Sequence, residues 1–143
     1  KQKEILPITD IRMTRFNITM EQSIKLVLFA LGNAKGSEIF VPKIPSYKII
    51  DIAKAINPKN KIKIVGIRPG EKIHEEMITE SDSYTTFDLG NCYAIVNPSN
   101  ETVLKYYTKN KKFKKVPENF SYSSGKNTDN LTVNQLKNLI NKL

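Results

Sequence analysis

Apolar residues recur along this chain with two spacings, one helical and one strand-like. Thr19 and Gln22 form the capping box that starts a helix, since each side chain can bond the backbone N–H of the other. Behind them, four apolar residues occupy positions i, i+3, i+4 and i+7 of that helix: Ile24, Val27, Leu28 and Leu31. The spacing predicts an amphipathic helix with one apolar face, ended by Gly32 and Gly36.

The next segments alternate between strand and helix patterns. Residues 38–41 predict a short strand ended by Pro42. Ser46 is a good N-cap for a second helix, which an Asn-Pro pair ends at Asn57. The apolar face of this second helix consists of Ile49, Ile52, Ala53 and Ile56. Residues 61–66 alternate lysine with apolar residues, which is typical of a half-buried strand.

The rest of the chain is predicted to form shorter elements. They are a charged Pro-Gly turn after Gly66, a short helix at 74–79, a strand at 92–96, a short helix at 101–108 and a loop at 109–126. Thr132 and Gln135 repeat the capping box before a last helix. Its apolar face consists of Val133, Leu136, Leu139, Ile140 and Leu143.

This alternation of helix and strand predicts a small α/β fold. We divide the chain at residue 100. Residues 1–100 form the α/β part, and residues 101–143 form a basic C-terminal tail whose terminal helix packs on the same domain.

The composition describes a globular chain. Of 143 residues, 39% are hydrophobic, which provides a core and argues against wholesale disorder. No apolar stretch approaches the roughly 18 residues of a membrane span, and the longest, at 24–31, contains Lys25. We therefore predict a cytoplasmic protein without a membrane span. The start at Lys1, without a signal-peptide pattern, favours a fragment of a longer intracellular protein.

Several kinds of chemistry lack the residues they need. Cys92 is the only cysteine and His74 the only histidine, which excludes an internal disulfide, a multi-cysteine zinc site and His-rich metal chemistry. Neither a G-x-G-x-x-G nor a complete P-loop sequence occurs. Tyr-x-x-x-Lys occurs twice, at Tyr107/Lys111 and Tyr122/Lys126, where chance alone gives about one pair, so we assign neither a catalytic role. His74 has no partner histidine, so we interpret it as structural. No catalytic residue and no metal site is predicted in this chain.

The positive charge is concentrated in one segment. The net charge is +9, from 23 Lys+Arg and 14 Asp+Glu. Residues 1–100 hold 14 basic and 11 acidic residues, net +3, whereas residues 101–143 hold 9 basic and 3 acidic residues, net +6. The excess gathers at Lys109, Lys111, Lys112, Lys114 and Lys115. Such a lysine run is more typical of a solvated loop than of a nucleic-acid site, so no nucleic-acid partner is predicted.

Two short segments hold all three arginines. Residues 6–16 contain Arg12 and Arg15, and the Arg-Pro-Gly-Glu string contains Arg68 and Glu71. A guanidinium is a planar fork that fits two phosphate oxygens, so loop arginines from separate segments can form a diphosphate clamp. A carboxylate three residues from one of them suits a sugar diol. The alternative is that these charges pair with each other.

These strings also carry a resemblance. Leu-Pro-Ile-Thr-Asp-Ile-Arg-Met-Thr-Arg-Phe at 6–16, Gly-Ser-Glu-Ile-Phe-Val-Pro-Lys-Ile-Pro-Ser at 36–46 and Gly-Ile-Arg-Pro-Gly-Glu-Lys-Ile-His-Glu-Glu at 66–76 are the clearest parts. The chain closely resembles the C-terminal substrate-binding part of the UDP-N-acetylglucosamine 4,6-dehydratases, which are extended short-chain dehydrogenase/reductases. The resemblance continues through 88–93 and 116–125 and spans nearly the whole chain.

The resemblance implies a nucleotide-sugar enzyme whose catalytic machinery lies upstream. A preceding Rossmann domain is expected to bind NADP and to carry a catalytic Tyr, a Lys and an acid/base carboxylate. The reaction oxidises C4 of the sugar, eliminates water across C5 and C6, and returns the hydride to C6; inverting members also epimerise C5 and begin pseudaminic acid biosynthesis. The implied partners are a UDP-sugar substrate, the protein's own N-terminal Rossmann domain and further copies in a homo-oligomer.

The resemblance also implies roles for five residues. Arg15 and Arg68 match arginines expected on the diphosphate, and Glu71 matches a residue expected on the uridine ribose. The strand from Ile5 to Thr9 matches the segment that lies along the uracil. One departure is Asn17, where relatives usually place an aromatic residue.

Two other functions remain open from the sequence. A UDP-sugar epimerase of capsule biosynthesis would share this fold and these strings. A basic binding module would instead use the lysine run at 109–115 to contact nucleic acid or another acidic partner.

Overall fold

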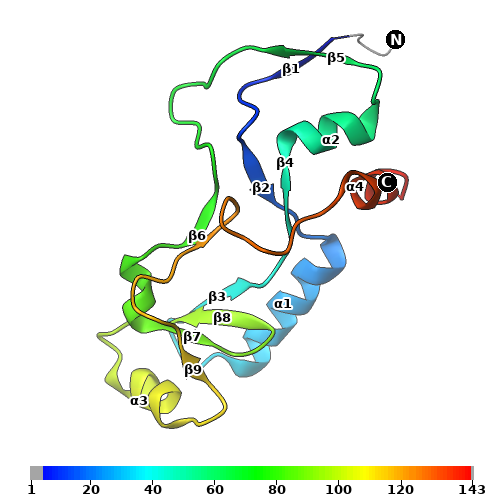
Figure 1. Cartoon of the computed structure of the whole chain (residues 1–143). Coiled ribbons are helices and arrows are strands. Elements are labelled where there is room, and N and C mark those ends of the chain that lie inside the picture. Colours follow the sequence, from blue (N-terminus) through cyan, green and yellow to red (C-terminus); the bar gives the residue numbers. More distant parts are fainter. Residues whose placement is uncertain (1–4, 143) are drawn as a thin grey trace. The chain divides into compact units, whose positions relative to one another are not determined.

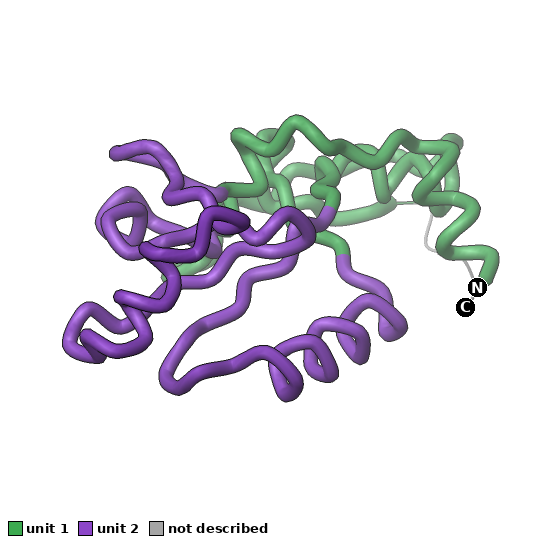
Figure 2. Tube along the Cα trace, turned by 90° about the horizontal axis from the view of Figure 1, so that it is seen from below, with its two compact units in different colours: residues 1–17, 45–75, 123–143 green, residues 18–44, 76–122 purple. Residues whose placement is uncertain are grey.

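The structure is a computed structural model that describes residues 5–142 (Figure 1). The chain divides into two compact units that interleave along the sequence (Figure 2). Unit 1 comprises residues 1–17, 45–75 and 123–143, and unit 2 comprises residues 18–44 and 76–122. The functional division at residue 100 stays a prediction.

Unit 1 contains two short strand pairs and two helices. β1 (Ile5–Ile8) runs parallel to β5 (Lys61–Ile64), and β2 (Thr14–Phe16) runs antiparallel to β4 (Ser46–Lys48). The helices α2 (Ile49–Ile56) and α4 (Val133–Ile140) pack against each other. The capping box at Thr132 starts α4 as predicted, and Leu136 is buried.

Unit 2 is built on an antiparallel sheet with the strand order β3-β8-β7-β9. These strands are β3 (Ile39–Pro42), β8 (Cys92–Ile95), β7 (Thr86–Asp88) and β9 (Lys114–Lys115). The other elements are α1 (Met20–Asn33), β6 (Glu76–Ile78), the 3₁₀ helix η1 (Ser81–Thr85) and α3 (Glu101–Lys109). The strand β10 (Tyr122–Ser123), which pairs with β6, spans the residue at which the chain passes from unit 2 to unit 1. The core cluster of unit 2 consists of Phe87, Ala94, Val96, Val103 and Tyr107.

The helix predicted to have its N-cap at Ser46 has it two residues later, at Lys48. The hydroxyl of Ser46 donates to Asn130 Oδ1 at 2.9 Å, and Ser46 is fully buried in β4. Lys48 is the N-cap of α2 and supplies no side-chain cap. Ser46 is therefore wrong as an N-cap, because a long-range partner takes its hydroxyl.

The helix predicted at 74–79 is also wrong. The carbonyl of Ile73 accepts from Thr14 N at 3.0 Å, and the carbonyl of Glu75 accepts from Ser124 N at 2.8 Å. Because these carbonyls accept hydrogen bonds from distant segments, they cannot accept the i→i+4 bonds of a helix. The strand β6 forms at Glu76–Ile78 in place of the predicted helix. The loop predicted at 109–126 likewise contains the short strands β9 and β10.

The helix α1 has the predicted capping box but turns its predicted apolar face to solvent. Thr19 N donates to Gln22 Oε1 at 2.9 Å, and Gln22 N donates to Thr19 Oγ1 at 3.2 Å. The predicted face is more than half exposed at each position: Ile24 52%, Val27 57%, Leu28 63% and Leu31 78%. The inward contact is instead made by Phe29, whose ring lies edge-on to Phe40 at 5.6 Å.

Candidate functional site

The candidate site lies in unit 1, where two sequence segments meet. Thr9 follows β1, and Arg15 lies in the middle of β2. The second segment is the Arg-Pro-Gly-Glu turn, in which Glu71 N donates to Arg68 O at 3.0 Å. Gly70 has φ +78°, the backbone conformation that a type II turn needs after proline. Proline and glycine therefore give this loop a defined shape.

Arg15 is anchored mainly by main-chain oxygens. Its Nη1 donates to Thr14 O at 2.7 Å and to Ile73 O at 3.1 Å. Two carboxylates stand further away, with Nη2 3.8 Å from Glu71 Oε1 and Nε 3.7 Å from Glu75 Oε1. The side chain is 19% exposed. Backbone carbonyls thus orient the guanidinium, and its remaining N–H donors make only long ion pairs with Glu71 and Glu75.

Glu71 connects the two predicted segments. Its Oε1 accepts a long hydrogen bond of 3.4 Å from Thr9 Oγ1, and its Oε2 accepts from Arg68 N at 3.1 Å. Thr9 Oγ1 also lies 2.9 Å from the sulfur of Met13. Thr9, Arg15 and Glu71 therefore come together, although they span 62 positions of sequence between Thr9 and Glu71.

Arg68 joins this group through its backbone rather than its side chain. Among residues 5–142, the structure gives its exposed guanidinium no ion pair and no side-chain hydrogen bond. Arg12 behaves differently, because it pairs with Asp10 at 2.7 Å. Ile5 is the first described residue of β1, opposite Lys61, and is 49% exposed. The alternative of internal charge pairing thus describes Arg12 and, loosely, Arg15, but not Arg68.

Two neighbours of Arg15, the acidic Glu75 and the aromatic Tyr47, were not predicted from the sequence as site residues. Glu75 Oε2 accepts from Phe16 N at 2.8 Å, which fixes that carboxylate beside β2. Tyr47 lies opposite Arg15 in the β2–β4 register, and burial, with a contribution from Glu75, raises the pKa of its phenol. The phenol of Tyr47 therefore remains protonated and uncharged opposite Arg15. Glu75 lies in the Ile-His-Glu end of the 66–76 string, so that string could have indicated it as a site residue.

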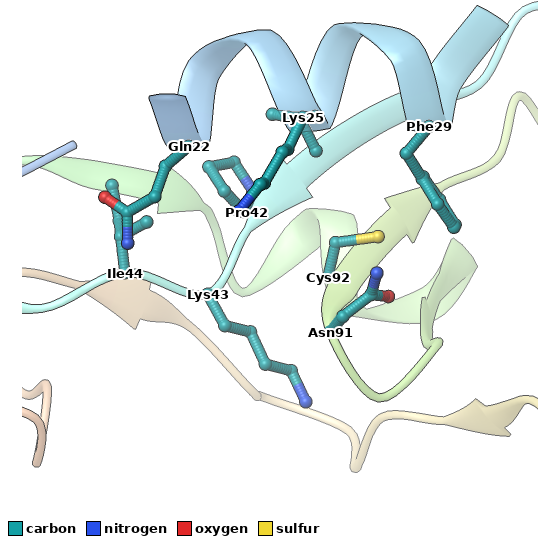
Figure 3. A pocket seen from close by; sticks show the side chains of 9 residues that line it. Gln22, Lys25, Phe29, Pro42, Lys43, Ile44, Asn91 and Cys92 are labelled. Atoms are coloured by element: carbon teal, nitrogen blue, oxygen red, sulfur yellow. The ribbon is translucent and has the colours of Figure 1, made fainter. Parts of the chain in front are cut away.

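Unit 2 contains a separate cavity of about 260 Å³ (Figure 3). Its lining combines Phe29, Pro42 and Ile44 with the polar groups of Gln22 and Lys25, and the thiol of Cys92 also lines it. Burial raises the pKa of this thiol, so Cys92 remains protonated. A buried neutral thiol behaves as a small apolar side chain.

Within the described residues, no three His, Cys, Asp or Glu side chains group as metal ligands do. No helix in that part of the chain is long and apolar enough to cross a membrane.

Comparison with known proteins identifies the family of this chain. The family model described as "Polysaccharide biosynthesis protein" matches residues 1–97, more than half of the chain. The chain therefore belongs to this family, and both segments of the candidate site fall inside the matched region.

Individual relatives are nucleotide-sugar enzymes by name. A Campylobacter jejuni protein named UDP-N-acetylglucosamine 4,6-dehydratase (inverting) is 45% identical over 145 aligned residues, covering 95% of this chain and 42% of the relative. A Rickettsia bellii protein named UDP-glucose 4-epimerase is 34% identical, covering 98% of this chain and 42% of the relative. The chain thus spans less than half the length of these relatives, and the resemblance seen in the sequence is confirmed.

The fold has a solved counterpart. The X-ray structure of Pen from Bacillus thuringiensis matches with a TM-score of 0.78 and 27% identity, covering 99% of this chain and 42% of Pen. The predicted fold class is confirmed: the chain has the mixed α/β fold of part of an extended short-chain dehydrogenase/reductase.

Proposed function

We propose that this chain is the UDP-sugar-binding portion of a nucleotide-sugar 4,6-dehydratase, acting on UDP-N-acetylglucosamine with inversion at C5. The observation that carries the proposal is the meeting of Thr9, Arg15 and Glu71 from two segments that both resemble the dehydratases. The greater identity to the relative with the dehydratase name, 45% against 34%, favours a dehydratase over an epimerase.

Each site residue has a role in this proposal that its chemistry can perform. Arg15 and Arg68 bind the diphosphate, because the exposed Arg68 fork has no partner among residues 5–142 and Arg15 is held by carbonyls that leave donors for phosphate. Glu71 accepts from the ribose hydroxyls once its long bond to Thr9 opens. β1, from Ile5 toward Thr9, offers main-chain groups and a threonine hydroxyl to the uracil.

The diphosphate role also has an electrostatic reason. Glu71 and Glu75 stand 3.8 and 3.7 Å from Arg15 without forming close bonds to it. A diphosphate carries more charge and can make shorter, two-pronged hydrogen bonds with the same guanidinium. The ligand therefore replaces weak ion pairs by stronger ones.

The remaining parts of the enzyme are proposed to lie outside this chain. A Rossmann domain would bind NADP and contribute the catalytic Tyr, Lys and acid/base carboxylate. Since this chain has no glycine-rich dinucleotide motif, we assign none of its residues to NADP. We further propose a cytoplasmic homo-oligomer for the complete enzyme, serving the synthesis of surface-glycan or flagellin sugars.

A binding experiment tests the nucleotide site directly. Titration of UDP into the 143-residue chain, followed by calorimetry, is expected to give saturable binding that Arg68→Ala weakens about tenfold or more, since hydrogen bonds to charged groups are among the strongest. Arg12→Ala is the matched control, because Arg12 belongs to the same segment as Arg15 but its guanidinium pairs with Asp10. Equal loss in both variants would point to nonspecific charge attraction and contradict the proposed clamp.

Turnover distinguishes dehydratase from epimerase. The chain joined to its upstream coding sequence is incubated with UDP-N-acetylglucosamine and NADP, and the sugar is followed by NMR. A 4-keto-6-deoxy product supports the dehydratase, and its C5 configuration tests inversion. If the sugar is only epimerised, the epimerase function is supported and the dehydratase function is contradicted.

A further inference from the structure

We propose that His74, Thr14 and Ser124 are positioning residues that hold the nucleotide-binding arginine and loop in place through one directed chain of hydrogen bonds. This inference rests on the proposed function, because the group it positions is the Arg15 guanidinium. None of the three side chains is proposed to touch the ligand.

The chain of hydrogen bonds joins three segments that are distant in sequence. Glu75 N donates to Ser124 Oγ at 2.9 Å. Ser124 Oγ lies 2.7 Å from Thr14 Oγ1, which in turn lies 2.8 Å from His74 Nδ1. Thr14 and Ser124 are 6% and 1% exposed, so water cannot readily replace either partner.

The direction of the chain follows from counting hydrogens. Ser124 and Thr14 each have one hydroxyl hydrogen. If Ser124 donates to Thr14 and Thr14 donates to Nδ1, both hydroxyls and the Glu75 N–H are paired by the contacts the structure records. His74 is then a neutral imidazole with an acceptor at Nδ1 and its hydrogen on Nε2. The opposite direction would need a further acceptor for the Ser124 hydroxyl.

This network reaches Arg15 through the backbone of the same loop. Thr14 N and Arg15 Nη1 both donate to Ile73 O, at 3.0 and 3.1 Å. The carbonyl of Ile73 belongs to the peptide group that joins it to His74, so the anchor at His74 orients that oxygen. On the other side, Ser124 N donates to Glu75 O at 2.8 Å, which holds the next peptide group.

Gly125 provides an independent sign that the ring position matters. A Cβ added at Gly125 would lie 2.6 Å from His74 Cγ and 2.7 Å from its Nδ1. Only a glycine lets the imidazole lie flat against this backbone with Nδ1 reaching Thr14. The turn after β10 therefore both bonds to the loop and leaves room for the ring.

An asparagine and a leucine at position 74 form a matched pair of test variants. Asn Oδ1 is the same number of bonds from the backbone as His Nδ1 and accepts a hydrogen bond, whereas leucine has the same branching without an acceptor. With UDP as the probe and the 143-residue chain, His74→Leu is expected to weaken binding about tenfold, as loss of an acceptor for a buried hydroxyl requires. His74→Asn is expected to stay within about twofold of the unsubstituted chain.

A second measurement reads the network without a ligand. Since His74 is the only histidine, its ring signals in ¹⁵N NMR are unambiguous. We expect the tautomer with hydrogen on Nε2, and faster hydrogen exchange of the Glu75 amide in His74→Leu than in His74→Asn.

The outcomes separate the two proposals. If the unsubstituted chain does not bind UDP, the proposed function and this inference both fail. If it binds UDP but His74→Leu binds equally well, only the positioning role fails. Hydrogen on Nδ1, or an equal loss of affinity in His74→Asn and His74→Leu, also overturns the directed chain.

Discussion

At the scale of single residues, several polar side chains of this protein bond to residues that are distant in the sequence. Thr14 contacts residues 60 and 110 positions away in the sequence, and Ser46 bonds to a residue 84 positions away. Asp88 is another such residue. It accepts from Lys43 Nζ at 2.6 Å and from Gly90 N at 2.7 Å.

The Asp88 pair makes stability depend on pH. Burial raises the pKa of Asp88, but the hydrogen bonds from Lys43 and Gly90 outweigh it, and the net pKa lies below the ordinary 3.8. A lowered carboxyl pKa contributes stability that is present above pH 3.8 and is lost as the pH falls through the folded-state value. Asp88→Asn is therefore expected to lower the urea midpoint at pH 7 and to have less effect under acidic conditions.

The control for this prediction is Glu101→Gln. Glu101 pairs with Lys105 on the surface of α3, where its side chain is 77% exposed, so the change should stay within about 0.5 kcal/mol. If Asp88→Asn lowered the urea midpoint equally at pH 7 and under acidic conditions, the ionised Asp88–Lys43 pair would not be the source of the stability.

At the scale of elements, α1 differs from the other helices because no residue in it is buried. Its spacing correctly predicted an amphipathic helix, but the apolar stripe faces solvent, and Met20 continues it at 77% exposure. The opposite side carries Phe29, which contacts Phe40. Periodicity identifies a helix and its faces, whereas the neighbours that exist in the fold decide which face is covered.

Substitutions on the two faces of α1 should therefore differ in cost. Leu28→Gln with Leu31→Gln removes exposed side chains, and we expect a change in unfolding free energy of no more than about 0.5 kcal/mol, with higher solubility. Phe29→Ala is expected to cost about 2 kcal/mol, because the half-buried ring loses its packing. Urea unfolding of both variants measures this. Similar costs on the two faces would mean that the leucine stripe is covered in solution.

At the scale of the whole molecule, the charge distribution and the candidate site are separate features. The net charge of +9 comes largely from lysines at 109–115, in unit 2, whereas Arg15, Arg68 and Glu71 lie in unit 1. Specific recognition of one nucleotide requires a few placed groups, and a lysine run attracts anions without regard to shape.

Removing part of the lysine run should therefore leave nucleotide binding intact. Lys111→Gln with Lys112→Gln is expected to change UDP affinity by less than about twofold at physiological ionic strength, because salt screens the attraction of exposed lysines that make no placed contact with the nucleotide. Calorimetry at two salt concentrations measures this. A loss as large as that of Arg68→Ala would favour the basic binding module instead.

The sequence by itself determined the local features of this protein. The capping boxes at Thr19 and Thr132 and the Pro-Gly turn before Glu71 all follow from interactions within a few residues, and the structure has each of them. The strings around Arg15 and Arg68 likewise sufficed to recognise the family.

Only the tertiary structure decided the features that depend on long-range contacts. The hydroxyl of Ser46 bonds to Asn130 and does not cap a helix as predicted. The backbone at 73–75 bonds to Thr14 and Ser124 and forms no helix. The contact of Thr9 with Glu71 and the network through His74 also arise this way. A backbone or hydroxyl group bonds whichever partner the fold brings within reach, and local spacing carries no record of partners 60 or more residues away.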